Sequence, residues 1–561
     1  MTNKNSRLTP VIIAVSIVIG ILIGTFYTEH FSGNRLGIIN SSSNKLNALL
    51  RIINEQYMDE ISMDSIVEEA MPLILEELDP HSKYIPAKDL EAVNSELEGK
   101  FSGVGLVFQI NHDTIVINKV IAGGPSEKVG LLPGDRILEV DGEPFTGKKI
   151  NNEYATSHLR GEKGSKVKLT VKRYGQEKPL DFIITRGDVP VSSVKAAYMF
   201  DDQTGYIRFE NFGRTTHMEM LNALAILSHK GMKGVIIDLR GNTGGIFEVA
   251  VQMANEFLSR GQLIVYAEGR KYPRNDKRAN GNGSFQKLPL IVLVDEYSAS
   301  ASEIFAGAIQ DNDRGLVIGR RTFGKGLVQQ PIEFSDGSAI RLTVARYYTA
   351  AGRCIQRPYN RGYDENYELD ILNRYNRGEF SYQDSIHLNK EKTFYTTRLH
   401  RPVYEASGIM PDIFVPLDTL GYTSWFLAVR NLYLPEQFCF NYIDTHRSEL
   451  QEYSNIDELV EHLRKEKIVD KFATFAHAHG VKRRNLMIKK SHHLIEERLF
   501  SNIIYIVLGE SSMYQYLNQS DQTVLTAAKL IEEGKAYPEA PVLDEDSTSK
   551  AKPSATKGKK N

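Results

Sequence analysis

Three serines lie in a stretch of small residues that could place a nucleophile at the start of a helix. Ser298 and Ser300 lie between the apolar run 290–294 and a second apolar pattern over 301–309, and Ser302 lies at the start of that second pattern. This order indicates a buried strand, a tight turn and a helix. A helix N-terminus carries unpaired N–H groups and a positive dipole end, which stabilise a developing oxyanion. Serine is also a favoured helix N-cap, so the stretch alone leaves a purely structural role open.

An α/β domain must position this turn. From residue 204 onward, runs of Val, Ile and Leu alternate with helical patterns, which is typical of a buried and largely parallel sheet covered by helices. We assign residues 190–417 to this domain. Its expected strands and helices are 206–209, 218–228, 234–239, 247–259, 290–294 and 301–309.

A β-rich segment precedes that domain. Short strand patterns at 104–110, 114–120, 136–140 and 166–172 are separated by turn residues. A glycine-containing turn precedes these strands. The turn and the strands together resemble a PDZ domain over residues 99–187. The resemblance implies that the turn binds a peptide C-terminus, because its glycines leave N–H groups free for a carboxylate and an edge strand follows. The turn consists of Phe101, Ser102, Gly103, Val104, Gly105 and Leu106.

The N-terminus carries a membrane signal. Residues 11–28 contain no charge and follow Lys4 and Arg7, which predicts a single-pass anchor with residues 1–10 in the cytoplasm. A cleaved signal peptide is the alternative, although no A-x-A site follows the segment.

Two further regions show helical spacing. Residues 43–98 are expected to form a helical N-terminal unit and residues 418–540 a helical C-terminal extension, whose role the pattern does not reveal. The lysine-rich residues 541–561 are expected to form a disordered tail.

Motifs in the α/β region resemble those of one peptidase family. Besides the serine turn, the chain contains Asp238-Leu-Arg-Gly-Asn-Thr-Gly-Gly245, Gly319-Arg-Arg-Thr-Phe-Gly-Lys-Gly-Leu-Val-Gln329, Leu342-Thr-Val-Ala-Arg-Tyr-Tyr-Thr-Ala-Ala-Gly-Arg-Cys-Ile-Gln356 and Gly408-Ile-Met-Pro-Asp-Ile413. In this order, after a PDZ-like segment, they are similar to the motifs of the carboxyl-terminal processing, or tail-specific, proteases. The resemblance covers roughly residues 43–417 and implies a serine peptidase with a Ser/Lys dyad.

The resemblance implies a specific catalytic pair. The family's nucleophile is the middle serine of the run and its lysine lies twenty-five positions later, which selects Ser300 and Lys325. Gln329 corresponds to the glutamine that orients the lysine. A lysine base must be neutral near pH 7 to 8, so its pKa must fall by about 3 units, or roughly 4 kcal/mol. Small and apolar neighbours of Lys325 favour the burial that this requires, whereas a surface lysine is the ordinary alternative.

The resemblance also implies an oxyanion hole. The family uses N–H groups of an Arg-x-Asn-x-Gly-Gly turn and of the residue after the serine, here Gly244, Gly245 and Ala301. Many members have Asn and Pro where this chain has Gly241 and Thr243, which is expected to shift the loop.

Two other features concern the coupling of domains and the cleft. The family places an arginine in the His-Leu-Arg-Gly-Glu stretch, here Arg160, through which the peptidase core senses the PDZ domain; a solvated charge at a helix end is the alternative. Residues 359–400 form a longer segment than the family's shorter members contain, and could either cover the cleft or hold a partner.

Composition and missing motifs exclude other functions. Lys and Arg number 68 against 70 Asp and Glu, and this balance argues against a nucleic-acid binder. Cys354 and Cys439 are too few for a disulfide framework or a four-thiolate zinc site. HExxH, P-loop and GxSxG motifs are missing, and Ser-x-x-Lys pairs occur too often in this lysine-rich chain to identify another site. We expect neither a metal nor a cofactor.

These observations predict a mixed α/β fold in which a PDZ domain is inserted into, or precedes, a peptidase core. The expected function is a serine endopeptidase that recognises flexible protein C-termini through the PDZ domain. The alternatives are a non-catalytic PDZ scaffold and a hydrolase of non-peptide amides or esters. The anchor predicts the inner membrane, with the catalytic part in the periplasm or otherwise outside the cytoplasm. The subunit number stays open, a homo-oligomer included.

Overall fold

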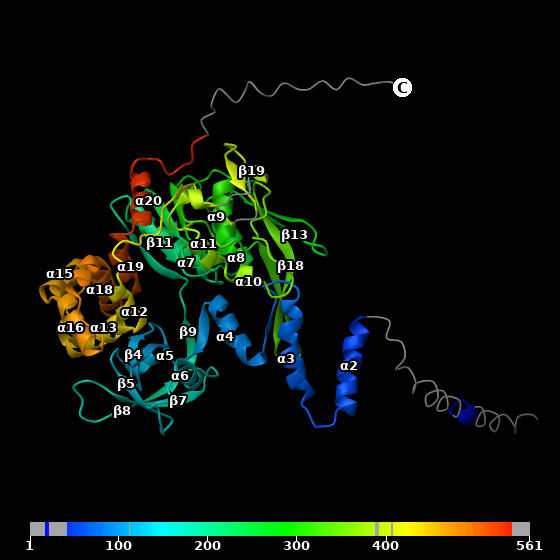
Figure 1. The fold of residues 1–561 in the computed structure, drawn as a ribbon, viewed down its shortest axis with the longest axis horizontal. Helices are drawn as coiled ribbons and strands as arrows, with labels where there is room; N and C mark the ends of the chain where they lie inside the picture. Colours follow the sequence, from blue (N-terminus) through cyan, green and yellow to red (C-terminus); the bar gives the residue numbers. More distant parts are fainter. Residues whose placement is uncertain (1–16, 22–41, 112, 387–391, 406–407, 541–561) are drawn as a thin grey trace, which may run out of the picture. The chain divides into compact units, whose positions relative to one another are not determined.

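The computed structural model describes residues 17–21, 42–111, 113–386, 392–405 and 408–540 (Figure 1). The chain divides into two compact units, residues 1–74 and 75–561, and each is described by itself. The first contains α2 (Ser42–Gln56) and most of α3 (Met63–Glu76). Among the described residues, no helix has the length and apolar character needed to cross a membrane. Apart from the helical residues 17–21, the predicted anchor at 11–28 lies outside the described residues, as does the predicted tail at 541–561.

A six-stranded sheet forms the centre of the second unit. Neighbouring strands are parallel except for the first pair, and the strands that carry the site are fully buried, as their continuous Val, Ile and Leu composition predicts. The prediction of a largely parallel sheet is confirmed. The strand order is β10 (Val194–Met199), β11 (Thr204–Phe209), β12 (Gly234–Asp238), β15 (Leu290–Val294), β16 (Leu316–Gly319) and β21 (Ile413–Phe414).

Helices cover both faces of this sheet. Because side chains alternate along a strand, Val235 and Ile237 of β12 join the core on one face and Ile236 the core on the other. The first core contains α7 (Thr216–His229), α8 (Phe247–Asn255) and α9 (Ala301–Asp311), and the second contains α20 (Gln522–Glu532). The carboxyl ends of parallel strands meet at one edge of a sheet, so the turns after β12 and β15 lie together there.

A second, antiparallel sheet stands beside the first. It contains β1 (Lys83–Ile85), β18 (Ala339–Thr349), β13 (Leu263–Glu268) and β14 (Asn275–Arg278), with β17 (Leu327–Glu333) also on β18. Since β1 precedes the predicted PDZ domain and β18 follows it, that domain is inserted into the predicted peptidase core. The sequence pattern places β1 within the helical stretch 43–98 and does not predict this sheet, because its strands pair across long separations.

The predicted PDZ domain follows α4 (Ala87–Glu98). Its chain enters through β2 (Lys100–Gly103) and leaves through β9 (Gly187–Pro190), and these two strands form a separate antiparallel pair. The domain's sheet has the order β3 (Leu106–Asn111), β4 (Thr114–Val120), β5 (Arg136–Val140), β7 (Lys166–Lys172) and β8 (Leu180–Thr185), with β6 (Glu143–Pro144) on β5 and two helices, α5 (Pro125–Val129) and α6 (Asn152–Leu159). Strand β3 is therefore an edge strand.

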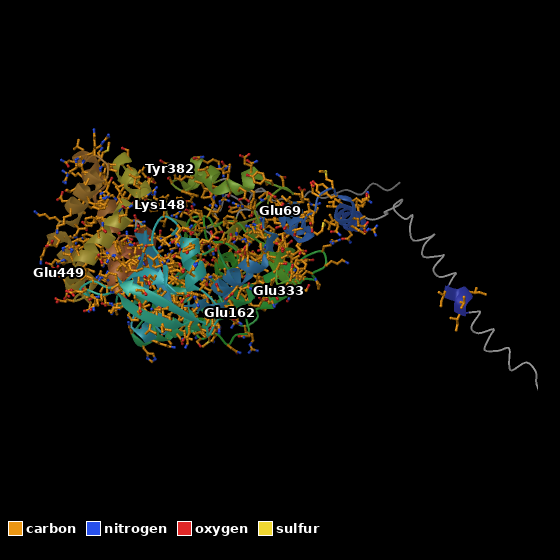
Figure 2. All side chains as sticks on the ribbon, turned by 90° about the horizontal axis from the view of Figure 1, so that it is seen from below. Glu69, Lys148, Glu162, Glu333, Tyr382 and Glu449 are labelled. Carbon is orange, nitrogen blue, oxygen red and sulfur yellow. The ribbon has the colours of Figure 1, made fainter. Side chains whose placement is uncertain are left out.

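Residues 359–400 carry short elements on the peptidase core. They are α10 (Glu365–Glu368), α11 (Asp370–Asn376), the 3-10 helix η2 (Gln383–Ser385) and β19 (Thr393–Tyr395), which pairs with β20 (Pro402–Tyr404). The side chain of Tyr382 in this segment is exposed (Figure 2).

The C-terminal region is helical, as predicted, and has an apolar core of its own that includes Phe438, Phe472 and Leu499. It also contacts the PDZ domain, where Arg136 and Asp444 form an ion pair of 2.6 Å. Before α20, its helices are α12 (Ser424–Asn431), α13 (Leu434–Thr445), α14 (Arg447–Leu450), α15 (Ile456–Lys465), α16 (Ile468–Ala478), α17 (Asn485–Lys490), α18 (His492–Leu508) and α19 (Glu510–Asn518).

Candidate active site

Ser300 lies where β15 turns into α9, and its backbone is strained. It is the N-cap of α9 with φ 54° and ψ −113°, a conformation that L residues rarely adopt and that costs about 1–3 kcal/mol. Strain of this kind persists only where the surrounding structure enforces it, and it gathers at functional sites. Ser300 is partly exposed, unlike Ser298 and Ser302, which are fully buried.

The two buried serines have structural partners. Ser298 Oγ donates to the carbonyl of Leu239 (2.8 Å), and Ser302 Oγ donates to the carbonyl of Asn242 (2.8 Å). These bonds fasten the turn after β12 to both sides of Ser300. The geometry therefore favours Ser300 as the serine that remains available for chemistry.

The turn after β12, residues 239–245, is called the oxyanion turn below. Gly244 N–H donates to Asn242 Oδ1 (2.9 Å), so it is already used within the turn. A Cβ on Gly244 would lie 2.7 Å from Ser300 Cβ, and one on Gly245 would lie 2.4 Å from the carbonyl oxygen of Phe212, so neither position has room for a side chain. The N–H groups of Gly245 and Ala301 have no acceptor among the described residues, which leaves these two of the three predicted donors for an oxyanion.

Lys325 lies on the loop between β16 and β17, and its amine is largely buried. Burial lowers the pKa of Lys325 to about 8, and the positive charges of Arg341 and Lys83 act in the same direction. Its Nζ donates to Gln329 Oε1 at 3.0 Å. No hydrogen bond between Lys325 Nζ and Ser300 Oγ is found among the described residues; such catalytic contacts often form only when substrate is bound.

Gln329 is itself held by a distant segment. Its Nε2 donates to the backbone carbonyl of His81, which turns Oε1 toward the lysine. Asp79 fixes the His81 backbone by accepting from its N–H (2.9 Å). Burial and the charge of Lys325 lower the pKa of the His81 ring to about 3, so this imidazole is neutral near pH 7. His81 lies within residues 43–98, for which the sequence pattern predicts only a helical unit, and it is not among the predicted site residues.

Two buried side chains tie the backbone of Ser300 to that of Lys325. Glu303, fully buried on α9, accepts from the N–H of Ser300 (2.9 Å), of Gly324 (2.7 Å) and of Lys325 (2.9 Å). Burial raises the pKa of Glu303 to about 7. The Tyr347 hydroxyl lies within hydrogen-bond range of the carbonyls of both Ser300 (3.0 Å) and Lys325. Both residues were missed, although a Glu three positions after a helix N-cap is a recognisable capping signal.

The segment 359–400 supports the lysine loop from outside. Arg374, fully buried on α11, donates to the carbonyls of Arg321 (2.6 Å) and Thr322 (3.1 Å). Glu379 pairs with both Arg374 (2.8 Å) and Arg321 (2.7 Å). These contacts hold the residues that lead directly to Lys325. The sequence pattern predicts that the segment 359–400 covers the cleft or holds a partner, and neither prediction includes this support.

Family models match three parts of the chain. The model of peptidase family S41 matches residues 203–368, the PDZ domain model matches residues 102–184, and a family of unknown function (DUF8443) matches residues 425–509. The first match contains Ser300, Lys325 and Gln329.

Two curated relatives are named as carboxy-terminal processing proteases. The carboxy-terminal processing protease CtpA of Bacillus subtilis is 35% identical over 319 residues, which are 57% of this chain and 67% of the relative. The carboxy-terminal-processing protease of Bartonella bacilliformis is 36% identical over 311 residues, covering 54% and 70%. The chain belongs to this protease family. Among solved structures, the photosystem II D1 C-terminal processing protease aligns over 68% of this chain and 88% of its own, with 28% identity and a TM-score of 0.36.

In this serine-type protease, the predicted carboxylate-binding turn is divided between a strand and a bend. Phe101 to Gly103 belong to β2 and pair with β9. Val104 and Gly105 form the bend, and Leu106 begins the edge strand β3. The N–H groups of Val104 and Gly105 donate to no acceptor among the described residues. This geometry suits a carboxylate beside an added peptide strand.

Arg160 of the protease lies beside that turn. It ends α6, and its guanidinium carbon lies 4.8 Å from the centre of the Phe101 ring. The contact joins two parts of the PDZ region, so coupling of Arg160 to the peptidase core stays a prediction. Cys354 and Cys439 are buried and unpaired, and among the described residues no group of three or more His, Cys, Asp or Glu side chains could hold a metal ion.

Proposed function

We propose that this protease cleaves peptide bonds near protein C-termini with Ser300 as nucleophile and Lys325 as general base. One observation carries the proposal. A partly exposed serine, strained at a helix N-terminus, is joined through Glu303 to the backbone of a lysine whose amine is largely buried and whose pKa falls to about 8.

The chemistry then follows from the geometry. The neutral Lys325 amine takes the Ser300 proton while Oγ attacks the substrate carbonyl, and the N–H groups of Ala301 and Gly245 bind the resulting oxyanion. The lysine ammonium next gives its proton to the leaving amine as the peptide bond breaks. Water, deprotonated by the same lysine, hydrolyses the acyl-enzyme and regenerates the serine. Gln329 orients the amine throughout.

The nucleophile is tested with paired serine variants. Full-length wild type, Ser300→Ala and Ser302→Ala are incubated with β-casein, an unstructured protein, and cleavage sites are located by mass spectrometry. We expect Ser300→Ala to lose cleavage while it keeps its fold, and Ser302→Ala to retain measurable activity. Cleavage by Ser300→Ala at the wild-type rate would rule out the assignment, and a folded, inactive wild type would favour the scaffold alternative.

We also propose that the PDZ domain selects a free C-terminal carboxylate. The free N–H groups of Val104 and Gly105 beside the edge strand β3 support this. A peptide with an apolar C-terminus should bind the full chain of Ser300→Ala more tightly than its amidated form, because amidation removes only the charge. Equal binding of the two peptides in calorimetry would end the proposal. Cleavage of a non-peptide ester in preference to both peptides would favour the other hydrolase alternative.

The location of the protease is proposed from the sequence pattern alone. We infer that residues 11–28 anchor it in the inner membrane, with the catalytic part outside the cytoplasm, because Lys4 and Arg7 precede an uncharged run. Protease added to intact spheroplasts should digest the catalytic part. Protection of the catalytic part from the added protease would contradict the inference. Recovery of the full-length protein in a fraction free of membranes would contradict it as well.

A further inference from the structure

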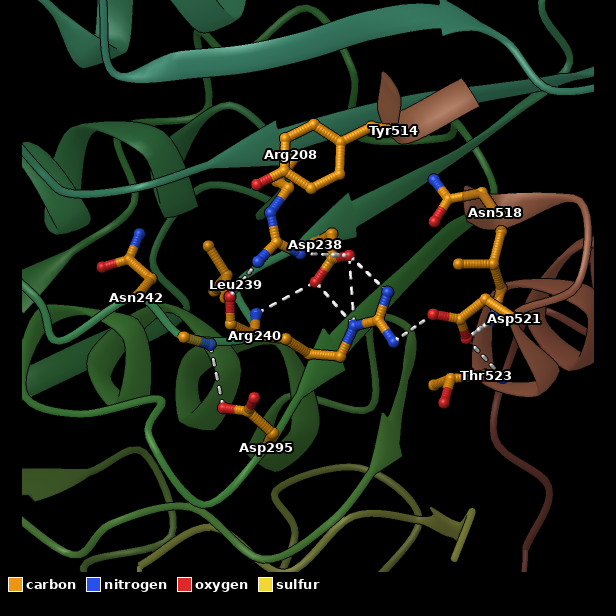
Figure 3. A network of polar contacts seen from close by, with 12 residues as sticks. Arg208, Asp238, Leu239, Arg240, Asn242, Asp295, Tyr514, Asn518, Asp521 and Thr523 are labelled. Carbon is orange, nitrogen blue, oxygen red and sulfur yellow. Dashed lines mark hydrogen bonds and ion pairs between the residues drawn. The ribbon is translucent and has the colours of Figure 1, made fainter. Parts of the chain in front are cut away.

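The oxyanion turn begins at a buried cluster of charges (Figure 3). Asp238, at the end of β12, is fully buried and accepts from the Tyr206 hydroxyl (2.6 Å), from Arg208 (2.9 Å) and from Arg240 (2.7 Å). Burial alone would raise the pKa of Asp238, but the two guanidinium groups outweigh it and hold the pKa below its usual value. Two positive charges thus share one carboxylate.

The second carboxylate comes from the C-terminal helical region. Asp521 Oδ2 pairs with Arg240 Nη1 at 2.7 Å, and Figure 3 shows this side chain facing Arg240 from the C-terminal segment. Its other oxygen, Oδ1, caps α20 by accepting from the N–H groups of Thr523 (2.8 Å) and Val524 (3.2 Å). One side chain therefore begins a helix and balances the charge of the cluster.

Arg240 is also the residue at which the oxyanion turn leaves the cluster. Its own N–H donates to Asp238 (2.9 Å), and its carbonyl accepts from Arg208 (2.8 Å). The next residue, Gly241, donates to Asp295 (2.9 Å). All of these partners belong to the peptidase core except Asp521. The direction of the chain from Arg240 toward Gly245 thus depends on the position of the Arg240 guanidinium. Asp521 helps to hold that guanidinium in place.

We propose that Asp521 is a positioning residue for the oxyanion hole, so that the helical C-terminal region completes the active site. The inference rests on the proposed function, because it requires the Gly245 N–H to bind the oxyanion. It also gives a task to a part of the C-terminal region that follows residues 425–509, the stretch matched by a family of unknown function.

The decisive variant is Asp521→Asn in the full-length protein. Asparagine keeps an oxygen that can cap α20, but its amide replaces the acceptor that Arg240 uses and removes the negative charge. The matched control is Asp470→Asn, the same change in an ion pair with Arg483 (2.6 Å) that is exposed on the same helical region.

The readout separates the oxyanion hole from substrate binding. A peptide aldehyde forms a tetrahedral adduct with the serine, whereas the matching peptide alcohol does not. We expect Asp521→Asn to lower kcat about tenfold with KM unchanged and to weaken aldehyde binding by a similar factor, while alcohol binding and the melting temperature match those of Asp470→Asn.

Three results would overturn the inference. They are unchanged kcat and aldehyde affinity, equal weakening of aldehyde and alcohol, and a fall in melting temperature that accounts for the lost activity. Wild type and Ser300→Ala are measured alongside. If wild type cleaves, Ser300→Ala does not, and Asp521→Asn behaves like Asp470→Asn, then only this inference fails; cleavage by Ser300→Ala instead removes the proposed function.

Discussion

The proposed nucleophile and the proposed base of this protease are held in two different ways. Ser300 is positioned by elements that meet at one edge of the parallel sheet, where the turns after β12 and β15 are joined by short hydrogen bonds. Lys325 lies on a loop without regular structure, and its supports come from His81 before the PDZ domain and from Arg374 in the segment 359–400. Hydrogen bonds between two neighbouring turns fix Ser300 in its strained conformation, whereas contacts from two distant segments fix Lys325.

This difference separates two kinds of damage. Changes near the serine should alter the height of the pH–activity curve, because they disturb the attack and the oxyanion. Changes around the lysine should also move the pH at which activity appears, because they alter the burial or the charges that lower the pKa of the amine. Glu303 accepts from the backbone N–H groups of both Ser300 and Lys325, so a change at Glu303 should have both effects.

The largest expected effect tests whether Lys325 acts as the general base. Lys325→Arg keeps a positive charge in the site but cannot be neutral near pH 8. Wild-type activity should rise as the pH passes about 8, because the neutral amine is the active form, and the variant should fall by roughly 10²–10⁴-fold at every pH. The check is kcat/KM between pH 6 and 10. A variant with wild-type activity would remove the general-base role.

The next effect tests the long-range support of the lysine loop. Arg374→Met removes a buried guanidinium together with its hydrogen bonds to the carbonyls of Arg321 and Thr322 and its ion pair with Glu379. Breaking such a buried pair costs about 3 kcal/mol, and we expect a lower melting temperature together with a kcat reduced by more than tenfold. Arg377→Met is the control, since Arg377 is exposed and lies 4.0 Å from Glu379. Identical behaviour of the two variants would show that the loop holds its position without Arg374.

A smaller effect is expected when only the orientation of the amine is lost. Gln329→Ala removes the acceptor 3.0 Å from Lys325 Nζ, and a hydrogen bond between neutral groups contributes about 0.5–1.5 kcal/mol. We therefore expect kcat to fall about tenfold with KM unchanged. Gln330→Ala, at the exposed neighbour on β17, should be silent in the same steady-state assay. Equal kinetics for both variants would contradict the orienting role.

The smallest effect sharpens the comparison through pH. Arg341→Met removes a positive charge that lowers the pKa of Lys325, so the rise of activity should move to higher pH while the plateau stays. Arg346→Met, on the exposed side of the same strand, is the control. Ser302→Ala should do the opposite and lower the plateau without moving the rise. The distinction between the two kinds of damage would be wrong if the pH at which activity rises shifted in Ser302→Ala. It would also be wrong if that pH did not shift in Arg341→Met.

The same division explains what the sequence could predict. The strand, turn and helix around Ser300 are contiguous, so periodicity predicts them, and β4, β5, β7 and β15 begin and end at the predicted residues. The motif resemblance adds Lys325 and Gln329. Of the predicted oxyanion donors, Gly244 uses its N–H within the turn, a detail that depends on where Asn242 Oδ1 points.

The rest depends on contacts between distant segments. His81 reaches Gln329 across 248 positions, and Asp521 reaches Arg240 across 281. Tyr347 can meet the backbones of both Ser300 and Lys325 only because β18 belongs to an antiparallel sheet whose pairing no local pattern reveals. A helix cap at Asp521 is readable from the sequence, but the arginine that shares its carboxylate is not.

The two-stranded entrance to the PDZ domain has a consequence for how the protein can be rebuilt. Gly103 and Gly187 lie directly opposite each other in the β2–β9 pair, so the chain leaves the core and returns to it at a single point. A two-residue hairpin turn spans such a pair of strand ends. The PDZ domain between these two glycines can therefore be deleted, or replaced by another domain whose termini are adjacent. Neither change alters the path of the chain through the peptidase core.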